Sequence, residues 1–407
     1  MPSSTPDAGF RLRDIAVAAY GPTVVSSTGY GAVMPVLALR ARELGADVST
    51  AAFVVSLLAL GMLAFSLPAG AVVARIGERR ALVIAGVVDA AAMLLATLSS
   101  SLLLLGVAVV VSGMTWTTFL MSRQGFMIDA VPLSHRARAL STLGGMHRVG
   151  VVIGPLLGAG AIHLFGLSSV FALAAVLSLA SAALALAMPD LGSEGRAEQQ
   201  QAGHLGVWSV LAAHRRTLLT LGVAVIVIGA SRSVRNGLLP LWADHVGLSA
   251  STTSLIFALA GAVDVLFFFP GGWLMDRHGR AIVAVPVVPS VAIGALLLPL
   301  TSGAVGVAAV MMLIALGNGL GSGIVMTLGA DAAPQRGRAQ FLGGWRLCGD
   351  IGNSSGPLMV SAIAAVAPLA TACVAIGALG LLGTGWVGWW TRVEDRRLAA
   401  ALERSDR

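Results

Sequence analysis

The chain has 407 residues, of which 57% are hydrophobic and only 11% are charged. Soluble domains carry about 25% charged residues, so this composition excludes a soluble enzyme, a secreted disulfide scaffold and a disordered chain. All 26 basic residues are arginine, and the formal charge is +7. Such an excess is typical of the cytoplasmic loops of membrane proteins. The sequence therefore predicts a protein that crosses a lipid bilayer many times and has no nucleic-acid partner.

Twelve stretches are long and apolar enough to cross a bilayer, which requires about 20 mostly apolar residues per helix. In chain order they cover residues 15–39, 50–73, 81–98, 102–127, 139–162, 168–188, 217–241, 250–275, 281–301, 303–329, 340–365 and 368–391. The first is too long for the core of a signal peptide, so we expect an uncleaved helix. The predicted fold class is an all-α membrane protein with twelve transmembrane helices in two six-helix halves.

Arginine is concentrated in alternate connections between these stretches. The connections at 99–101, 163–167 and 301–303 contain none, whereas the termini, the middle loop and the other connections contain 19 of the 26. Only Arg40 and Arg42 fall on the opposite side. Because basic residues remain in the cytoplasm, we expect both termini to be cytoplasmic. The expected location is a cell membrane, in particular a bacterial inner membrane.

Four short motifs recur in the same order at a spacing close to 202 residues. They are Pro68-Ala69-Gly70 and Pro270-Gly271-Gly272, Asp129-Ala130-Val131-Pro132 and Asp331-Ala332-Ala333-Pro334, Arg-x-Arg-Ala at 136–139 and 336–339, and Gly150-x-x-x-Gly154-Pro155 and Gly352-x-x-x-Gly356-Pro357. A duplicated six-helix unit explains this order. In such proteins the substrate path runs near the membrane midplane at the interface between the halves.

The repeat divides the chain into an N-terminal half (1–188), a linker (189–216), a C-terminal half (217–392) and a tail (393–407). The linker is the one long polar stretch. Its final part fits an amphipathic helix on the inner membrane surface, and a simple tether between the halves fits equally well.

The connection between the eighth and ninth stretches resembles a known signature. Gly272-x-x-x-Asp276-Arg277-x-Gly279-Arg280 matches the loop motif of the major facilitator superfamily, and the copy in the first half has Ala74 in place of the aspartate. The resemblance extends over essentially the whole chain. It implies alternating access between two halves, a small-molecule substrate and a monomeric protein.

The resemblance also implies a conformational latch at this loop. A carboxylate beside arginines at a helix end can pair with them and with the positive end of a neighbouring helix dipole. Asp276 and Arg277 are the expected centre of the latch, with a partner at the start of the fifth helix. A surface turn that only retains positive charge inside is the alternative. The candidate residues are Gly70, Arg75, Gly77, Arg79, Gly272, Asp276, Arg277, Gly279 and Arg280.

Gly150, Gly154, Pro155 and Gly158 resemble the fifth-helix signature of the family's proton-coupled drug antiporters. Small residues at this spacing let helices approach closely, and proline permits a bend. In the family this face meets the eighth helix across the two halves. We therefore expect it to serve packing, gating or both.

Charged side chains inside the predicted spans are candidates for proton coupling. A charge at the bilayer centre costs at least about 2.5–3.5 kcal/mol, so it faces a cavity or a partner. The proton-coupling candidates are Asp264, Asp350, Arg123 and His147, and Arg123 resembles the family's fourth-helix arginine.

Each candidate for proton coupling has an ordinary alternative. Asp350 can pair with Arg346, four residues earlier on the same helix face. Arg123 can extend to the membrane interface, and His147 can bond a backbone carbonyl. Asp89 falls on a helix that the family keeps outside the cavity, so we expect a structural pair there.

Further polar and aromatic side chains are predicted to line a substrate cavity. They are Arg148, Arg232, Arg235, Asn236, Asn318, Arg346, Trp345 and Trp116. The arginines favour an anionic or carbonyl-rich substrate. Pairing of Arg232 and Arg235 with Asp264 or Asp244 is the alternative, and tryptophans at helical spacing more often pack or face lipid.

These features predict a proton-coupled secondary transporter that exports a small organic or drug-like molecule. A transporter of small organic anions is one alternative, and a membrane sensor that transports nothing is another. No nucleophile–base motif is present, so we predict no enzyme and no catalytic residue. A chain without lysine cannot form a Walker A motif, and no cluster has metal-ligand spacing, so no cofactor or metal is expected. The predicted partners are the substrate, protons and the lipid bilayer.

Overall fold

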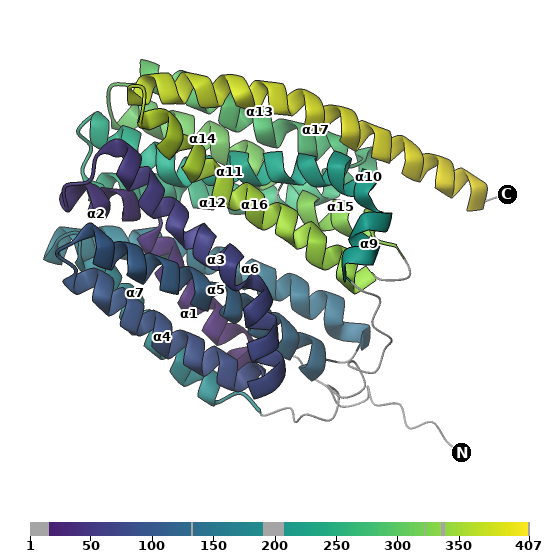
Figure 1. Ribbon diagram of the computed structural model, residues 1–407, viewed down its shortest axis with the longest axis horizontal. Coiled ribbons are helices and arrows are strands. Elements are labelled where there is room, and N and C mark those ends of the chain that lie inside the picture. The colour runs from purple at the N-terminus through teal and green to yellow at the C-terminus, as the bar shows by residue number, and fades with distance from the viewer. Residues whose placement is uncertain (1–15, 132, 190–206, 322, 335–337, 406–407) are drawn as a thin grey trace.

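The computed structural model describes residues 16–131, 133–189, 207–321, 323–334 and 338–405, and the side chains of a few residues inside these ranges lie outside the description. Every regular element in the described ranges is a helix (Figure 1). The all-α fold predicted from the composition is therefore confirmed.

The first half of the chain forms one bundle. Its helices are α1 (Ala16–Val33), α2 (Leu37–Glu43), α3 (Val48–Ile76), α4 (Glu78–Leu98), α5 (Leu102–Ala130), α6 (Leu133–Phe165) and α7 (Ser169–Leu186). Helices α1 and α2 are bent by 42° relative to each other. They occupy the place of the first predicted span.

The second half of the chain forms the other bundle. Its elements are α9 (Val207–Ala213), α10 (Arg215–Thr217), the π-helix η2 (Leu218–Gly222), α11 (Val223–His245), α12 (Ala250–His278), α13 (Ala281–Leu297), the 3-10 helix η3 (Leu298–Leu300), α14 (Ala304–Leu320), α15 (Ile324–Ala332), α16 (Arg338–Ala364) and α17 (Leu369–Ser405).

Ten described helices are long and apolar enough to cross a membrane, and the bent pair α1–α2 makes eleven. The sequence predicted twelve spans. The difference is α16, which has 27 residues but contains Arg346, Asp350 and Asn353 and is therefore less apolar. Helix α16 packs against α11 and α3.

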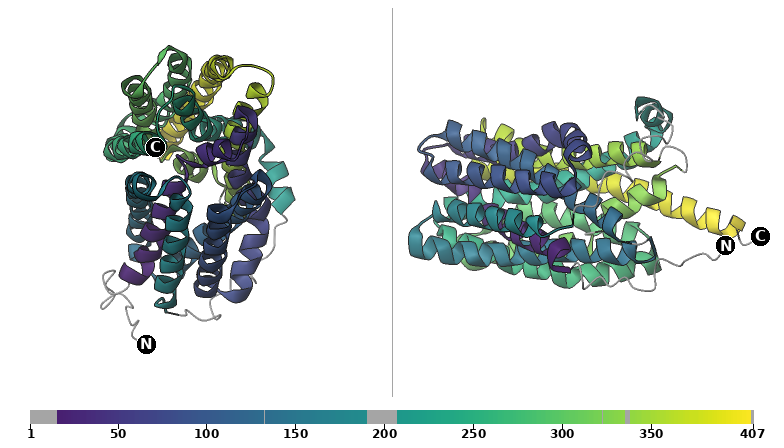
Figure 2. Two further views of the ribbon diagram at one scale, coloured as in Figure 1. Left: turned by 90° about the vertical axis from the view of Figure 1, so that its left-hand side faces the viewer. Right: turned by 90° about the horizontal axis from the view of Figure 1, so that it is seen from below.

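The two halves lie side by side, with the purple-to-blue helices in one bundle and the green-to-yellow helices in the other (Figures 1 and 2). The main contacts between them join α3 to α16 and α6 to α12. Helices α3 and α12 each have 29 residues, and their bounds are 202 residues apart. The spacing found in the motifs is thus also the spacing of the helices.

Helices α3 and α12 have the same kind of N-cap and both end at a glycine. The side chains of Asp47 and Ser249 accept hydrogen bonds from the backbone N–H groups of Thr50 (2.7 Å) and Thr252 (3.1 Å), which satisfies one free donor of each first turn. Gly77 and Gly279 follow the two helices with φ of 90° and 91°. Only glycine adopts this conformation without strain, which accounts for these two positions of the loop motif.

The bundle has two distinct ends. We call the end where α1 begins and α17 ends the terminal end, and the end that carries α2 the opposite end (Figure 1). At the opposite end, Ser49 Oγ on α3 donates to the carbonyl of Ser361 on α16 at 2.8 Å, and Ser251 Oγ on α12 donates to the carbonyl of Ala159 on α6 at 3.3 Å. The two bonds are related by the 202-residue repeat.

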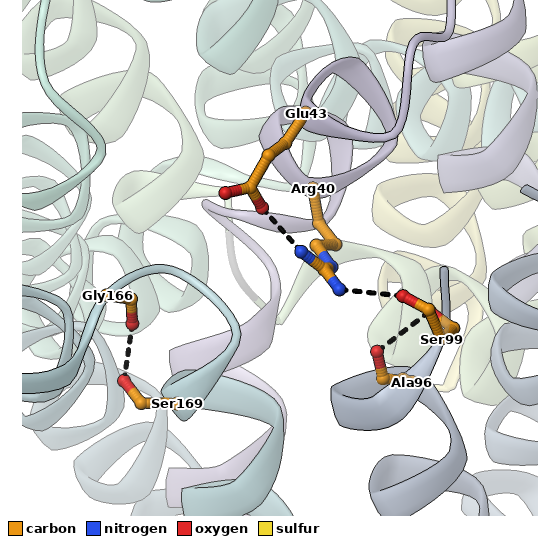
Figure 3. Close-up of polar contacts among 6 residues, drawn as sticks. All are labelled: Arg40, Glu43, Ala96, Ser99, Gly166 and Ser169. Carbon is orange, nitrogen blue, oxygen red and sulfur yellow. Dashed lines mark hydrogen bonds and ion pairs between the residues drawn. The ribbon is translucent and has the colours of Figure 1, made fainter. Parts of the chain in front are cut away.

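An ion pair joins the halves at the same end, where Arg42 Nε on α2 donates to Asp244 Oδ2 on α11 at 3.2 Å. The neighbouring Arg40 stays within its own half, because it bonds the Glu43 carboxylate at 2.6 Å and the Ser99 carbonyl at 2.8 Å (Figure 3). Each hydrogen bond that the structure describes between the halves lies at the opposite end.

Candidate functional site

A central cavity lies between the halves, with a free volume of about 320 Å³. The N-terminal half contributes mainly apolar side chains from α1, α3 and α6, whereas the C-terminal half contributes polar ones from α11, α12, α14 and α16. The polar side chains of the described lining are Tyr30, His147, Arg148, Arg232, Ser233, Arg235, Asn236, Asp264, Asn318 and Asn353.

Asp264 on α12 is the centre of the polar side of this cavity. Its Oδ2 accepts hydrogen bonds from Arg235 Nη1 on α11 and from Asn318 Nδ2 on α14, both at 3.0 Å. Its Oδ1 is buried and has no hydrogen-bond partner in the described structure. One carboxylate oxygen therefore accepts two hydrogen bonds, while the other accepts none in the described structure.

The glycine at position 319 allows the side-chain amide of Asn318 to reach the Asp264 carboxylate. Gly319 follows Asn318, and a Cβ atom at Gly319 would come within 2.7 Å of the Asp264 carbonyl oxygen. Small residues of this kind let two helices approach closely inside a membrane. The close contact of α14 with α12 thus places Asn318 within reach of Asp264.

Arg232 and Arg148 approach the cavity from different halves. Arg232 Nη2 donates to the carbonyl of Gly321, just after the end of α14, at 2.6 Å, where the helix dipole adds negative potential. Arg148 on α6 crosses to the other half, with its guanidinium 4.2 Å from the centre of the Phe268 ring on α12. This distance is within the range of a cation–π contact.

The described lining contains three arginines and one aspartate, which leaves an excess of two positive charges. Of these arginines, Arg235 is paired with a carboxylate, whereas Arg148 and Arg232 contact a ring and a carbonyl. Asn236 also lines the cavity. A cavity with this balance attracts anions and disfavours cations.

His147 lines the cavity close to an aromatic cluster. Its Nδ1 is 2.7 Å from Ser27 Oγ, so the expected backbone-carbonyl partner is replaced by a hydroxyl. Trp116 stacks on Tyr30, with ring centres 4.4 Å apart, and does not belong to the lining of this cavity. Tyr30 separates the tryptophan from it.

The other candidates lie outside the described lining. Asp350 is 4.0 Å from Arg346 on its own helix, which is the pair that the alternative interpretation expected. Trp345 is 4% exposed and donates to the Val325 carbonyl at 2.8 Å. Arg123 lies over the Phe119 ring at 5.7 Å.

The glycines of α6 pack within their own half. Cβ atoms at Gly150 and Gly154 would collide with α1 at Val24, Ser27 and Thr28. The expectation that this face meets the eighth helix is therefore wrong, because the approach that needs glycine is between α6 and α1. At Gly158 the nearest residue is Ala32, again on α1. Pro155 is within α6, which continues through it without a break.

The latch candidates lie at the terminal end. Arg79 donates to the Leu186 carbonyl at 2.6 Å within its own half, and Arg277 lies over the Trp273 ring at 5.5 Å. Arg75 is exposed, and a Cβ atom at Gly70 or at Gly272 would meet nothing within 4 Å. The side chain of Asp276 lies outside the described residues.

Arg280 joins the loop motif to two other helices. Its Nε donates to Asp331 Oδ2 on α15 at 2.8 Å, while its backbone N–H donates to Asp395 Oδ1 on α17 at 2.8 Å. Asp395 also accepts from the N–H of Ala281 at 2.9 Å. Sequence reasoning missed both acids, although Asp331 belongs to a repeated motif and could have been paired with the arginine.

Tyr30 and Asn353 also line the cavity and were missed. The repeat offered a signal for Tyr30, because it lies 202 residues before Arg232. Among the described residues, no group of three or more His, Cys, Asp or Glu side chains is placed to hold a metal ion.

Two helical bundles around a polar central cavity define a multi-pass membrane transporter. The sequence matches the family model of the Major Facilitator Superfamily over residues 23–357 and 221–406, and the chain belongs to this family. It is a secondary transporter and not an enzyme. No curated protein matches the sequence.

Solved structures of transporters share the fold. A POT family transporter in complex with 5-aminolevulinic acid superposes with a TM-score of 0.75 at 15% identity, covering 96% of this chain and 98% of the other. The nucleoside transporter NupG gives 0.70 at 14% identity over 91% and 97%. A D-xylose-proton symporter gives 0.70 at 15% identity over 93% and 97%. At these identities the likeness establishes the fold alone.

Proposed function

We propose that this chain is a proton-coupled symporter of a small organic anion. The observation that carries the proposal is the excess of arginine over aspartate in the central cavity, where Arg148, Arg232 and Arg235 surround Asp264. Arginine recognises carboxylate groups with two parallel hydrogen bonds. The apolar wall from the N-terminal half would hold the hydrocarbon part of the substrate.

Competition for one guanidinium would couple the proton to the anion. While Asp264 is ionised, it pairs with Arg235 at 3.0 Å. A proton on the unpartnered Oδ1 would neutralise this carboxylate and free Arg235 to bind the negative group of a substrate. The proton and the anion would therefore bind in the same state, which is the requirement for symport. In antiport, the two would instead have to exclude each other.

Alternating access would follow from the two ends of the bundle. The hydrogen bonds between the halves that involve described residues lie at the opposite end, as expected for a cavity that faces the terminal end. With the termini in the cytoplasm, as the distribution of arginine favours, this conformation would face the cytoplasm of a cell with the protein in its membrane. We expect a monomer, because one chain contains both walls of the cavity.

Export of a drug-like molecule was the first prediction from the sequence. Binding of a lipophilic cation is favoured by uncompensated negative charge, and the only carboxylate in the described lining is Asp264, which is already paired with Arg235. The geometry favours the organic-anion alternative for this reason. The candidates Asp350, Arg123 and Arg346 have no role in this proposal.

Purified protein in liposomes that enclose a pH-sensitive dye tests the proposal. Small mono- and dicarboxylates added outside should acidify the lumen faster than in protein-free vesicles, which control for passive entry of weak acids. Protein carrying Arg235→Gln provides a matched control for specific binding. Proton movement driven by lipophilic cations and not by anions would overturn the anion proposal in favour of drug antiport.

A further inference from the structure

A second, smaller cavity lies inside the N-terminal half, between α1, α4, α5 and α7, with a free volume of about 40 Å³. Asp89 on α4 is the one charged side chain of its described lining. The walls are otherwise hydroxyl, aromatic and aliphatic. A water molecule needs about 10–15 Å³ of such space, so the cavity has room for roughly three waters.

Three hydroxyl groups from two other helices meet the Asp89 carboxyl group. Ser112 Oγ on α5 is 2.6 Å and Thr115 Oγ1 on α5 is 3.0 Å from Oδ1, while Ser178 Oγ on α7 is 2.6 Å from Oδ2. The sequence had suggested a structural pair at Asp89. The observed partners in the described structure are neutral, so no ion pair compensates an ionised Asp89.

Counting the hydroxyl hydrogens indicates the state of the carboxyl group. The single hydrogen of Thr115 has two possible acceptors, which are the Ser112 carbonyl at 2.8 Å and Asp89 Oδ1 at 3.0 Å. If it goes to the nearer carbonyl, the contact with Oδ1 is a hydrogen bond only when Asp89 itself carries a proton. A protonated Asp89 would then donate to Thr115 and accept from Ser112 and Ser178. In this arrangement each of the three hydroxyl groups and both carboxyl oxygens take part in a hydrogen bond.

The charges around Asp89 favour the neutral form. Helix α7 contains no titratable side chain, and α1 contributes Tyr30 to the cavity. On α5 the nearest charge is Arg123, eight residues beyond Thr115, or about 12 Å along the helix. On its own helix the nearest charge is Arg80, nine residues away, and on α3 it is Arg75 at the terminal end. An ionised carboxylate inside a membrane protein normally pairs with an opposite charge, and the described groups that meet Asp89 supply none.

The C-terminal half shows that the fold does not require a carboxyl group at the position of Asp89. The position 202 residues after Asp89 is Val291, and the position after Ser112 is Ile314. Both are buried in one apolar core cluster. A half of the same architecture thus packs well with aliphatic side chains at these two positions.

We infer that Asp89 is a second proton-binding site, protonated in the conformation described here and hydrated from its own cavity. It is separate from Asp264, because Tyr30, Met34 and Leu58 line both cavities and form the wall between them. The inference does not depend on the identity of the substrate. It holds equally if the organic-anion proposal fails.

Infrared difference spectroscopy of the purified protein in lipid membranes tests this inference. The spectrum should contain the carbonyl stretch of a protonated carboxyl group at neutral pH, and Asp89→Asn should remove it. The stretch should shift in D₂O, because water in the cavity permits exchange. Asp47→Asn removes an exposed carboxylate at the opposite end and should leave the band unchanged.

Two further measurements keep the test decisive if Asp89→Asn folds poorly. Thr115→Val retains Asp89 but removes its acceptor, so the band should persist at a shifted frequency. Ser178→Ala should shift it as well, through loss of a donor to Oδ2. Absence of a protonated-carboxyl band that depends on Asp89, or a carboxylate band that responds to Na⁺, would overturn the inference.

Discussion

The two halves repeat the same helices but place their charges in different locations. Positions 202 residues apart pair Tyr30 with Arg232, Val33 with Arg235, Met62 with Asp264 and Trp116 with Asn318. The polar network of the C-terminal half thus lies in the central cavity between the halves. The N-terminal half presents mainly apolar side chains there, together with His147 and Arg148, and buries its own carboxyl group, Asp89, among hydroxyls. The comparison teaches that one architecture accommodates charge in two ways, each with its own set of partners.

The largest effect should come from placing an acid in the half that lacks hydroxyl partners. Val291→Asp inserts a carboxyl group into an apolar core where Ile314 replaces Ser112. An uncompensated buried charge costs several kcal/mol, so the variant should express poorly or unfold at a much lower temperature. Asp89→Val, the reciprocal change, should retain most of the stability. Equal melting temperatures of the two variants in detergent would show that the halves do not differ in this way.

Arg235→Gln should nearly abolish transport, because it removes the proposed anion-binding group and leaves Asp264 without its charged partner. Loss of one partner of a buried, hydrogen-bonded charge pair costs about 2–5 kcal/mol, which corresponds to a reduction in kcat/KM of roughly 30-fold or more. Uptake of a radiolabelled carboxylate that the unmodified protein transports measures this reduction. Val33→Ala, at the repeat position in the other half, is the matched control and should change uptake little.

Asp264→Asn should separate anion movement from proton movement. The amide cannot bind or release a proton, so exchange of labelled for unlabelled anion should continue while a proton gradient no longer drives accumulation. Met62→Leu at the repeat position should retain coupling. Gradient-driven accumulation by Asp264→Asn would exclude Asp264 as the coupling group and return attention to His147 and Asp350.

A smaller effect is expected from the hydrogen bonds that join the halves at the opposite end. Ser49→Ala and Ser251→Ala each remove one bond, worth about 0.5–1.5 kcal/mol. The double variant should shift the equilibrium toward the conformation in which this end is open. Distances between spin labels on α2 and α11 would report the shift. An unchanged distance distribution would mean that the apolar contacts hold this end closed without the serines.

The smallest effect concerns the caps that begin α3 and α12. The backbone N–H of Thr50 donates to Asp47 and lowers the pKa of that carboxyl group below its usual range. A carboxylate with a lowered pKa stabilises the folded state above its pKa in the unfolded chain, and this contribution is lost as the pH falls through the folded pKa. Asp47→Asn should therefore retain stability at neutral pH and lose part of its acid dependence, since asparagine is an equally good cap. Ser249→Asn is the control, because neither side chain titrates. Melting temperatures between neutral and acidic pH provide the measurement.

The helices, the repeat and the family could be predicted from sequence because they depend on local hydrophobicity and on motif spacing. Charge and polarity are rare in such spans, so the sequence identified Arg148, Arg232, Arg235, Asn236 and Asn318 as cavity candidates and Asp264 and His147 as proton-coupling candidates, and all seven line the cavity. How far the cavity extends along a helix could not be predicted. On α16, Arg346, Asp350 and Asn353 share one face at spacings of four and three residues, but of these three only Asn353 belongs to the described lining. The glycines of α6 present another difficulty, because small residues indicate a close approach without naming the partner.

The ion pair at the opposite end has a consequence for the duplication itself. Arg42 and Asp244 are 202 residues apart, so they occupy the same position in the two halves, and they meet each other. A two-fold axis brings a position into contact with its own copy. Two identical six-helix chains assembled in this way would face arginine with arginine or aspartate with aspartate. Opposite charges at this point require two copies of different sequence, which the duplicated chain provides.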